Sequence, residues 1–167
     1  MIAVVVPVPE EAQELRGRAR VLDLRRRARA VTAWAAALVG APSPVFRLDE
    51  QGRPLPHRGW YWSYSHNKRG VAGVVNTRRV GVDIEADRAP TFIGDTKAWV
   101  QAEASLKHLG HGIRRLTHVR FPFGPIGGRV QVGSDLVPVS LIRAEPMWAA
   151  CTGLDVHWVV EGFRRAL

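Results

Sequence analysis

The sequence has little cysteine, little lysine and no long apolar run. Its one cysteine, Cys151, excludes an internal disulfide and any metal site built from several cysteines. No apolar stretch approaches the roughly 18–20 residues that a membrane-spanning helix needs. Segment 1–9 lacks the basic start of a signal peptide and is interrupted by Pro7 and Pro9, so it predicts a strand. We therefore expect a cytoplasmic protein with no membrane partner.

Several common site motifs are also missing. The six histidines are scattered, without the HExxH spacing or the paired His/Cys spacing of zinc sites. Neither the GxGxxG nor the Walker loop of nucleotide-binding proteins occurs. The usual zinc and nucleotide-binding signatures are thus excluded.

The chain is short and basic. Its 167 residues are 46% hydrophobic and 23% charged, which predicts one domain or at most two small lobes with a real core. Lysine and arginine outnumber the acids by 24 to 15, for a net charge of +9. Only Lys68, Lys97 and Lys107 are lysine, and abundant Arg, Ala, Val and Gly are typical of a GC-rich genome. The alternative is a polyanionic partner: nucleic acid, a phosphorylated cofactor or an acidic protein.

Hydrophobic periodicity predicts an α+β chain. Helices are expected at 10–15 (or a turn there), at 23–39 before Gly40 and Pro42, and at 98–109 before Gly110. Strands are expected at 2–8, 45–48 and 80–85, and a hairpin at 60–65 and 71–75. The remainder predicts an antiparallel meander and a short final helix, with strands at 128–132, 137–142, 147–151 and 157–160 and the helix at 161–166.

Three acidic residues form the sharpest local feature. Asp83 and Glu85 stand at i and i+2 of a predicted strand, so their carboxylates leave one face about 7 Å apart. Glu103 lies on the helix that follows. Three oxygen ligands with room for water and phosphate oxygens suit Mg²⁺. The alternative is that the first two acids are simply the polar face of an edge strand.

Other polar residues could join this site. His66, after Ser65, could contact a phosphate or act as a base, or could be a surface turn histidine. Lys107 shares a helix face with Glu103, either as an exposed ion pair or as a cation that meets a phosphate. Arginines crowd the first turns of helix 23–39, which is unfavourable for the helix dipole. They are therefore either solvated or retained for an anion.

Four short motifs occur in a fixed order: GRP at 52–54, WSYSHN at 62–67, GVDIE at 81–85 and WVQAEASLK at 99–107. The set resembles the GKP, SxSH, G(I/V)D(I/V)E and WxxKEAxxK motifs of the surfactin-type, pseudo-dimeric 4′-phosphopantetheinyl transferases. The resemblance covers roughly residues 20–110. It implies a fold of two similar α+β lobes, each with a small antiparallel sheet packed on a helix, here 1–86 and 87–167.

The resemblance also implies an activity and its residues. Coenzyme A would bind between the lobes, and its phosphopantetheine arm would pass to a serine of an acyl or peptidyl carrier protein. Mg²⁺ would be held by Asp83, Glu85 and Glu103. Glu103 could take the serine proton, and Lys107 would stabilise phosphate charge. The expected coenzyme A contacts are Ser65, His66, Arg53 with Pro54 near the nucleotide, and Arg29 or Arg27 at the 3′-phosphate. A monomer or weak dimer is expected.

Two departures from the family pattern support an alternative function. The first lysine of WxxKEAxxK is Ala102 here, and only segment 86–98 separates Glu85 from Trp99. A diverged relative could keep the fold and serve another role in a carrier-protein-dependent pathway. A third hypothesis is a nucleic-acid-binding module that uses the arginine helix and the Trp60–Trp62 cluster. The expected burial of these aromatics argues against nucleic acid as the partner.

Overall fold

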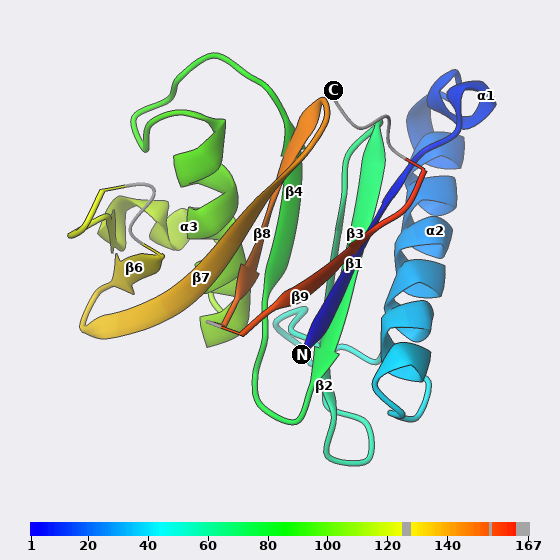
Figure 1. Cartoon of the computed structure of the whole chain (residues 1–167), viewed down its shortest axis with the longest axis horizontal. Helices are drawn as coiled ribbons and strands as arrows, with labels where there is room; N and C mark the ends of the chain where they lie inside the picture. The colour runs from blue at the N-terminus through cyan, green and yellow to red at the C-terminus, as the bar shows by residue number, and fades with distance from the viewer. Residues whose placement is uncertain (125–127, 154, 163–167) are drawn as a thin grey trace.

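Two sheets, the first mixed and the second antiparallel, lie face to face, and each is covered on its outer side by one helix. The computed structural model describes residues 1–124, 128–153 and 155–162. Its layers follow the order α2 (Gly17–Leu38), first sheet, second sheet and α3 (Thr96–Leu109), as Figure 1 shows. The protein is therefore α+β, as its sequence predicts. No helix within the described ranges is long and apolar enough to cross a membrane.

The first sheet has the strand order β2-β3-β1-β9. β1 (Ile2–Pro7) pairs antiparallel with β3 (Gly70–Asn76), and β3 forms the predicted hairpin with β2 (Tyr61–His66). The short helix α1 (Glu10–Gln13) leads into α2. β9 (His157–Val160) pairs parallel with β1, so the end of the described chain joins the sheet in which it begins.

The second sheet has the order β4-β8-β7-β6-β5. β4 (Val82–Ala86) pairs antiparallel with β8 (Met147–Thr152), which also pairs with β7 (Asp135–Ala144). Between β4 and β7 the chain forms α3, the 3₁₀ helix η1 (Ile113–His118), β5 (Val119–Arg120) and β6 (Arg129–Val132). β4 therefore belongs to the second sheet although it lies within the expected first lobe, 1–86.

The two sheets share one connection pattern. In the first, a strand leads through a helix into a hairpin whose second strand pairs with the first: β1, α2, β2, β3. In the second, β4, α3, β7 and β8 repeat that sequence of steps. We call these the first unit and the second unit. The short β5 and β6 are added at the outer edge of the second unit.

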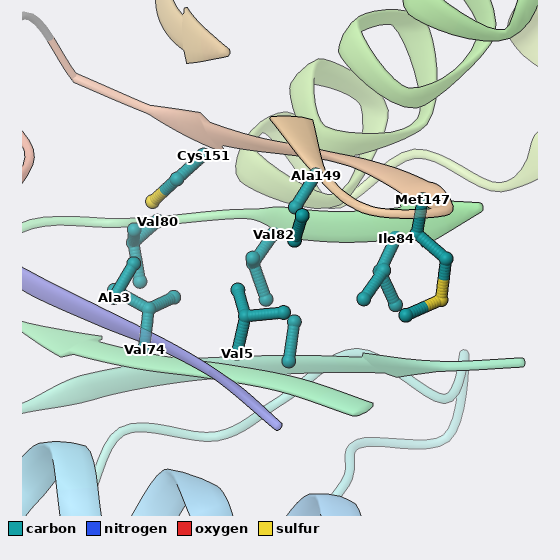
Figure 2. Packing of buried hydrophobic residues seen from close by; sticks show 11 residues of the cluster. Ala3, Val5, Val74, Val80, Val82, Ile84, Met147, Ala149 and Cys151 are labelled. Atoms are coloured by element: carbon teal, nitrogen blue, oxygen red, sulfur yellow. The ribbon is translucent and has the colours of Figure 1, made fainter. Parts of the chain in front are cut away.

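The core between the sheets comes from alternate residues of their strands. Ala3 and Val5 of β1 and Val82 and Ile84 of β4 project into this layer, where Figure 2 shows them facing one another. The intervening Val4 packs instead against α2. Since successive side chains of a strand point to opposite faces, both faces of β1 are buried. This explains its nearly continuous apolar sequence.

A glycine lets each helix approach the strands of its unit. A Cβ on Gly73 of β3 would collide with Thr32 of α2, including its backbone nitrogen and Cα, both at 2.7 Å. A Cβ on Gly81, just before β4, would collide with the carbonyl of Ala104 and approach the amide nitrogen of His108 to 2.7 Å, both on α3. The glycine of the GVDIE motif thus has a packing role.

Three sequence predictions need correction. Residues 45–48 do not form a strand; Leu48 makes only an isolated bridge to Pro54. The C-terminal part is not a simple meander, because β9 leaves its neighbours and pairs parallel with β1. The long helix begins at Gly17 rather than residue 23. The predicted helix 161–166 falls mostly outside the described residues.

Candidate functional site

The site lies where an edge strand of the first unit, β2, meets an edge strand of the second, β4. The outer edge of β4 pairs with no other strand among the described residues. Side chains instead form hydrogen bonds with its backbone amide and carbonyl groups. Ser63 Oγ accepts from the Val82 amide at 3.2 Å, and Asn67 Nδ2 donates to the Ile84 carbonyl at 3.2 Å. Buried backbone groups left unpaired would be costly, so these contacts join the two units.

Asp83 is the centre of this junction. Its carboxylate is buried, with 1% of the residue exposed. Oδ1 accepts from Ser65 Oγ of β2 and from Lys107 Nζ of α3, both at 2.7 Å. Oδ2 is buried and has no hydrogen-bond partner among the described residues. Three elements from both units therefore converge on one carboxylate, half of which remains unsatisfied.

Glu85 and Glu103 lie close to this carboxylate. Burial, followed by the negative charge of Asp83, raises the pKa of each glutamate to about 7. The charge of Glu103 raises the pKa of Glu85 further, while Lys107 and Arg88 oppose the shift. The three predicted acids therefore act on one another electrostatically, with Lys107 and Arg88 as the cations that oppose the shift.

The predicted coenzyme A ligands His66, Arg27 and Arg29 have different surroundings. Burial lowers the pKa of His66, and the charges of Lys107 and Arg25 act in the same direction. Arg27 instead donates to Asp23 at 2.6 Å, and Arg29 lies over the Phe46 ring. The charge of Arg25 thus acts on His66, whereas Arg27 and Arg29, the predicted ligands of the 3′-phosphate, contact Asp23 and Phe46.

A groove lined by several basic residues, together with the acid Asp49, adjoins Lys107. It consists of two hollows of about 300 and 270 Å³ that share five residues: Arg53, Pro54, Trp62, Lys107 and Gly110. Arg79 and His108 line the first hollow, and His111 lines the second. Arg53 Nε donates to Asp49 at 2.6 Å, which steadies the 49–54 turn at the rim. We call this feature the cationic groove.

Lys107 connects the groove with the acids. The groove is lined by the first residues of β2, by Val80 just before β4 and by the end of α3. Among the described residues, Asp83, Glu85, Glu103 and His66 are not part of this lining. Lys107 takes part in both halves, because it lines both hollows and also donates to Asp83 and to the Val82 carbonyl.

Sequence reasoning missed Arg79 and His108. Arg79 lies in the turn before β4 and belongs to no motif. His108 follows Lys107 and contacts Thr152 Oγ1 of β8 at 3.2 Å; burial lowers the pKa of its imidazole. A signal was available for His108, since it follows a predicted site residue in the last turn of the helix. The sequence gives no local signal for Arg79, because its position in the groove depends on the tertiary packing of the second unit.

The two departures from the family pattern can be located. Ala102 is fully buried in the apolar cluster between α3 and the second sheet, away from the carboxylates. Within segment 86–98, residues 87–95 form the loop between β4 and α3, where Arg88 lies over the ring of Trp99 of α3 with its Cζ 4.1 Å from the ring centre. Asp87 is bound by both terminal nitrogens of Arg143, at 2.8 and 2.6 Å. The short segment is therefore tied down at both of these points.

The carboxylates fit a divalent cation in part. The buried, unpartnered Oδ2 of Asp83 and the raised pKa values of both glutamates indicate a shortage of positive charge. Within the described ranges, however, no three acidic, histidine or cysteine side chains converge closely enough to hold an ion by themselves. Mg²⁺ commonly takes only one or two protein carboxylates and completes its shell with water and phosphate oxygens. The donor set is thus compatible with Mg²⁺ shared with a phosphate ligand.

Comparisons of the sequence with protein-family models and with curated proteins gave no match.

Proposed function

We propose that the protein is a Mg²⁺-dependent 4′-phosphopantetheinyl transferase. The observation that carries the proposal is that Lys107 both donates to the buried Asp83, whose charge acts on Glu85 and Glu103, and lines the cationic groove. A phosphate ester bound beside Lys107 would have its anionic oxygens beside cations and its reacting bond beside a base. The ordered resemblance of the four motifs supports coenzyme A as that ester and a carrier-protein serine as the acceptor.

Each residue has a role that its surroundings favour. Arg53, Arg79 and Lys107 would bind phosphate groups in the groove, and Ser65 holds Asp83 in place. Glu103, which is within electrostatic reach of Asp83 and shares its helix with Lys107, could accept the proton of an attacking hydroxyl. Asp83, with Glu85 or Glu103, would hold Mg²⁺. When bound, the ion would neutralise charge on the pyrophosphate.

The serine oxygen forms a bond to the β-phosphorus of coenzyme A, and its proton passes to Glu103. The phosphorus–oxygen bond of the pyrophosphate breaks, and 3′,5′-ADP leaves with the electron pair. Lys107 stabilises the charge that builds up on the phosphate oxygens.

Mass spectrometry of an apo carrier protein tests the proposal. With coenzyme A and Mg²⁺, the carrier should gain one phosphopantetheine, and chelation of the metal should stop the gain. Glu103→Gln should abolish transfer. Lys97→Gln, on the same helix but stacked on Trp148, is the matched control and should retain it. A panel of apo acyl and peptidyl carriers that stays unmodified at saturating coenzyme A would contradict the proposal.

A diverged relative is the second candidate. Two observations favour it: Asp83 Oδ1 is already occupied by two donors, and the segment before α3 is short. Such a protein would bind coenzyme A or its thioesters in the groove without transferring the arm. Calorimetry separates the candidates, because tight coenzyme A binding together with no transfer to any carrier would favour the second.

A further inference from the structure

Lys107 lies between the acids, to which it donates, and the cationic groove, which it lines. Its Nζ donates to Asp83 Oδ1 at 2.7 Å and to the Val82 carbonyl at 3.1 Å, which places it against the acids. The same side chain lines both hollows of the cationic groove, and 32% of it remains exposed. A lysine ammonium is a compact charge on a flexible four-carbon stem, so it can move between neighbouring partners.

From this we infer that Lys107 links two binding events: an anion in the cationic groove strengthens the binding of a divalent cation at Asp83. Without ligands, Lys107 supplies the positive charge that the buried carboxylate requires. A phosphate group in the groove draws the ammonium toward itself and frees Oδ1. Asp83 then presents two oxygens, because Oδ2 already lacks a partner among the described residues.

The energetics favour such an exchange over simple loss of the ion pair. A buried carboxylate without a cation is strongly destabilised, so Lys107 does not leave unless another positive charge replaces it. A divalent cation alone must in turn displace the ammonium or accept its repulsion. Anion and cation therefore bind better together than singly, and by linkage each raises the affinity of the other by the same factor.

The inference rests on the proposed function only for the identity of the two ligands. Another route to linkage exists, since the anion could itself become a ligand of the metal. That route does not involve Lys107. Removal of the ammonium therefore distinguishes them: direct bridging survives the substitution, whereas a linkage transmitted by Lys107 does not.

The experiment measures Mn²⁺ binding by the electron paramagnetic resonance signal of the free ion. Each protein is titrated with and without saturating adenosine 3′,5′-bisphosphate at constant ionic strength. In the native protein we expect the nucleotide to tighten Mn²⁺ binding by about tenfold, within the usual range of coupling energies. Lys107→Gln should bind Mn²⁺ more tightly than the native protein without nucleotide, and should gain little when nucleotide is added.

Lys97→Gln is the matched control, because it removes the same charge from the same helix at a site stacked on Trp148. It should keep the native linkage. The inference is overturned if the native protein shows no linkage, or if the linkage persists in Lys107→Gln. Transfer activity does not decide it: linkage without transfer would contradict only the proposed function, and transfer without linkage only this inference.

A measurement on the native protein covers the case in which Lys107→Gln does not fold. The chain has only three lysines, so the ¹⁵N spectrum of its side-chain ammonium groups is simple. Lys107 should give a slowly exchanging signal, because its ammonium donates to a buried carboxylate. Adding Mg²⁺ and nucleotide together should shift that signal more than the sum of the shifts that each causes alone. Additive shifts would overturn the inference.

Discussion

The first and second units share a chain path but differ in what lies between strand and helix. In the first, Val4 of β1 is buried against α2 among apolar neighbours. In the second, the residue at the corresponding face of β4 is Asp83, which is buried just as deeply but is bound to Lys107 of α3. The contact between β1 and α2 is therefore apolar, whereas the contact between β4 and α3 carries a charged site, although the rest of α3 packs on the second sheet through an apolar cluster.

The second unit lacks the apolar contact that Val4 makes between strand and helix in the first unit. Val82 and Ile84 form the apolar face of β4 at the interface between the sheets. Both units therefore contribute apolar side chains to this interface. Only the helix-facing side of β4 carries charge. Because a buried charge needs partners, the second unit must draw on Ser65 from the first. The site thus depends on both units, whereas the first unit's own strand–helix layer does not.

The largest expected effect comes from closing the gap between strand and helix. Gly81→Ala places a Cβ against the backbone of α3, which cannot move aside as a side chain could. We expect a loss of more than about 3 kcal/mol in the free energy of unfolding, beyond the usual 1–3 kcal/mol for overpacking. Gly73→Ala should be comparably harmful, since it meets the backbone of Thr32.

Urea denaturation followed by circular dichroism measures both losses. The matched control is Gly112→Ala, because a Cβ there meets nothing within 4 Å. A fully stable Gly81→Ala would show that α3 does not approach β4 as closely as described.

The next prediction concerns replacement of the charged pair between β4 and α3 by apolar side chains, like those between β1 and α2. Lys107→Met alone leaves Asp83 buried without its cation and should cost about 2–4 kcal/mol, less than a fully buried pair because Lys107 is partly exposed. Asp83→Val together with Lys107→Met should recover most of that loss, since apolar replacement of both partners is often neutral. Neither the single nor the double variant should show the proposed transfer activity.

A double-mutant cycle on unfolding free energies measures the coupling. If the double variant is no more stable than Lys107→Met, then the second unit does not tolerate the packing of the first, and the two layers are not equivalent.

A smaller effect depends on pH. Burial raises the pKa of Glu85 and Glu103 from 4.5 to about 7, so the folded protein holds protons that the unfolded chain releases. The stability that these two glutamates contribute is therefore fully present below pH 4.5 and is lost as the pH rises to 7, while the lowered pKa values of His66 and His108 contribute in the opposite direction. Glu103→Gln should remove part of this slope and stabilise the protein at pH 8 by about 1–2 kcal/mol, after allowance for partial exposure.

The control for this prediction is Glu11→Gln, an exposed acid of α1 in the first unit, which should leave the slope unchanged. Urea midpoints between pH 4.5 and 8 give the comparison. An unchanged slope in Glu103→Gln would mean that its carboxyl is not held at a raised pKa.

Local pattern predicted most of the elements but not how they combine. The hairpin at 60–65 and 71–75 and the helix ending at Gly110 are confirmed, because alternation, helical spacing and turn residues are local signals. The parallel pairing of β9 with β1 was missed, since it joins segments about 150 residues apart and nothing in 157–160 identifies its neighbour. Residues 45–48 have strand-like composition but find no continuous partner.

The same contrast applies to the site. Asp83 and Glu85 could be placed on one face from their spacing, and Lys107 beside Glu103 from helical geometry. The contact of Ser65 with Asp83 depends on how the two edge strands meet. The arginines could not be ranked from sequence for a related reason: Arg27 and Arg29 find partners on their own helix and in the 41–48 loop, while Arg25 is the helix arginine with a resolved influence on His66.

The smallest effects concern the ends of the two helices. α3 is capped: Asp95 accepts from the Ala98 amide at 3.0 Å, and Gly110 ends the helix in the left-handed region at φ 71°. α2 has no side-chain cap and no acid in its first turn, where Arg18 lies near the positive end of the dipole. Asp95→Ala should therefore destabilise the protein by about 1 kcal/mol. Arg18→Glu should instead stabilise it by about 0.3–1 kcal/mol.

Asp95→Ala and Arg18→Glu have opposite effects on stability only if α2 and α3 differ in the capping and charge of their first turns rather than in their packing. Thermal unfolding at low and high salt tests this, because the effect of Arg18→Glu should shrink as salt screens the dipole, while the hydrogen bond lost in Asp95→Ala should persist. Arg18→Gln separates removal of the unfavourable charge from addition of a favourable one, and should give about half the gain. Equal losses in Asp95→Ala and Arg18→Glu would show that α2 uses its first-turn arginine in a contact of its own.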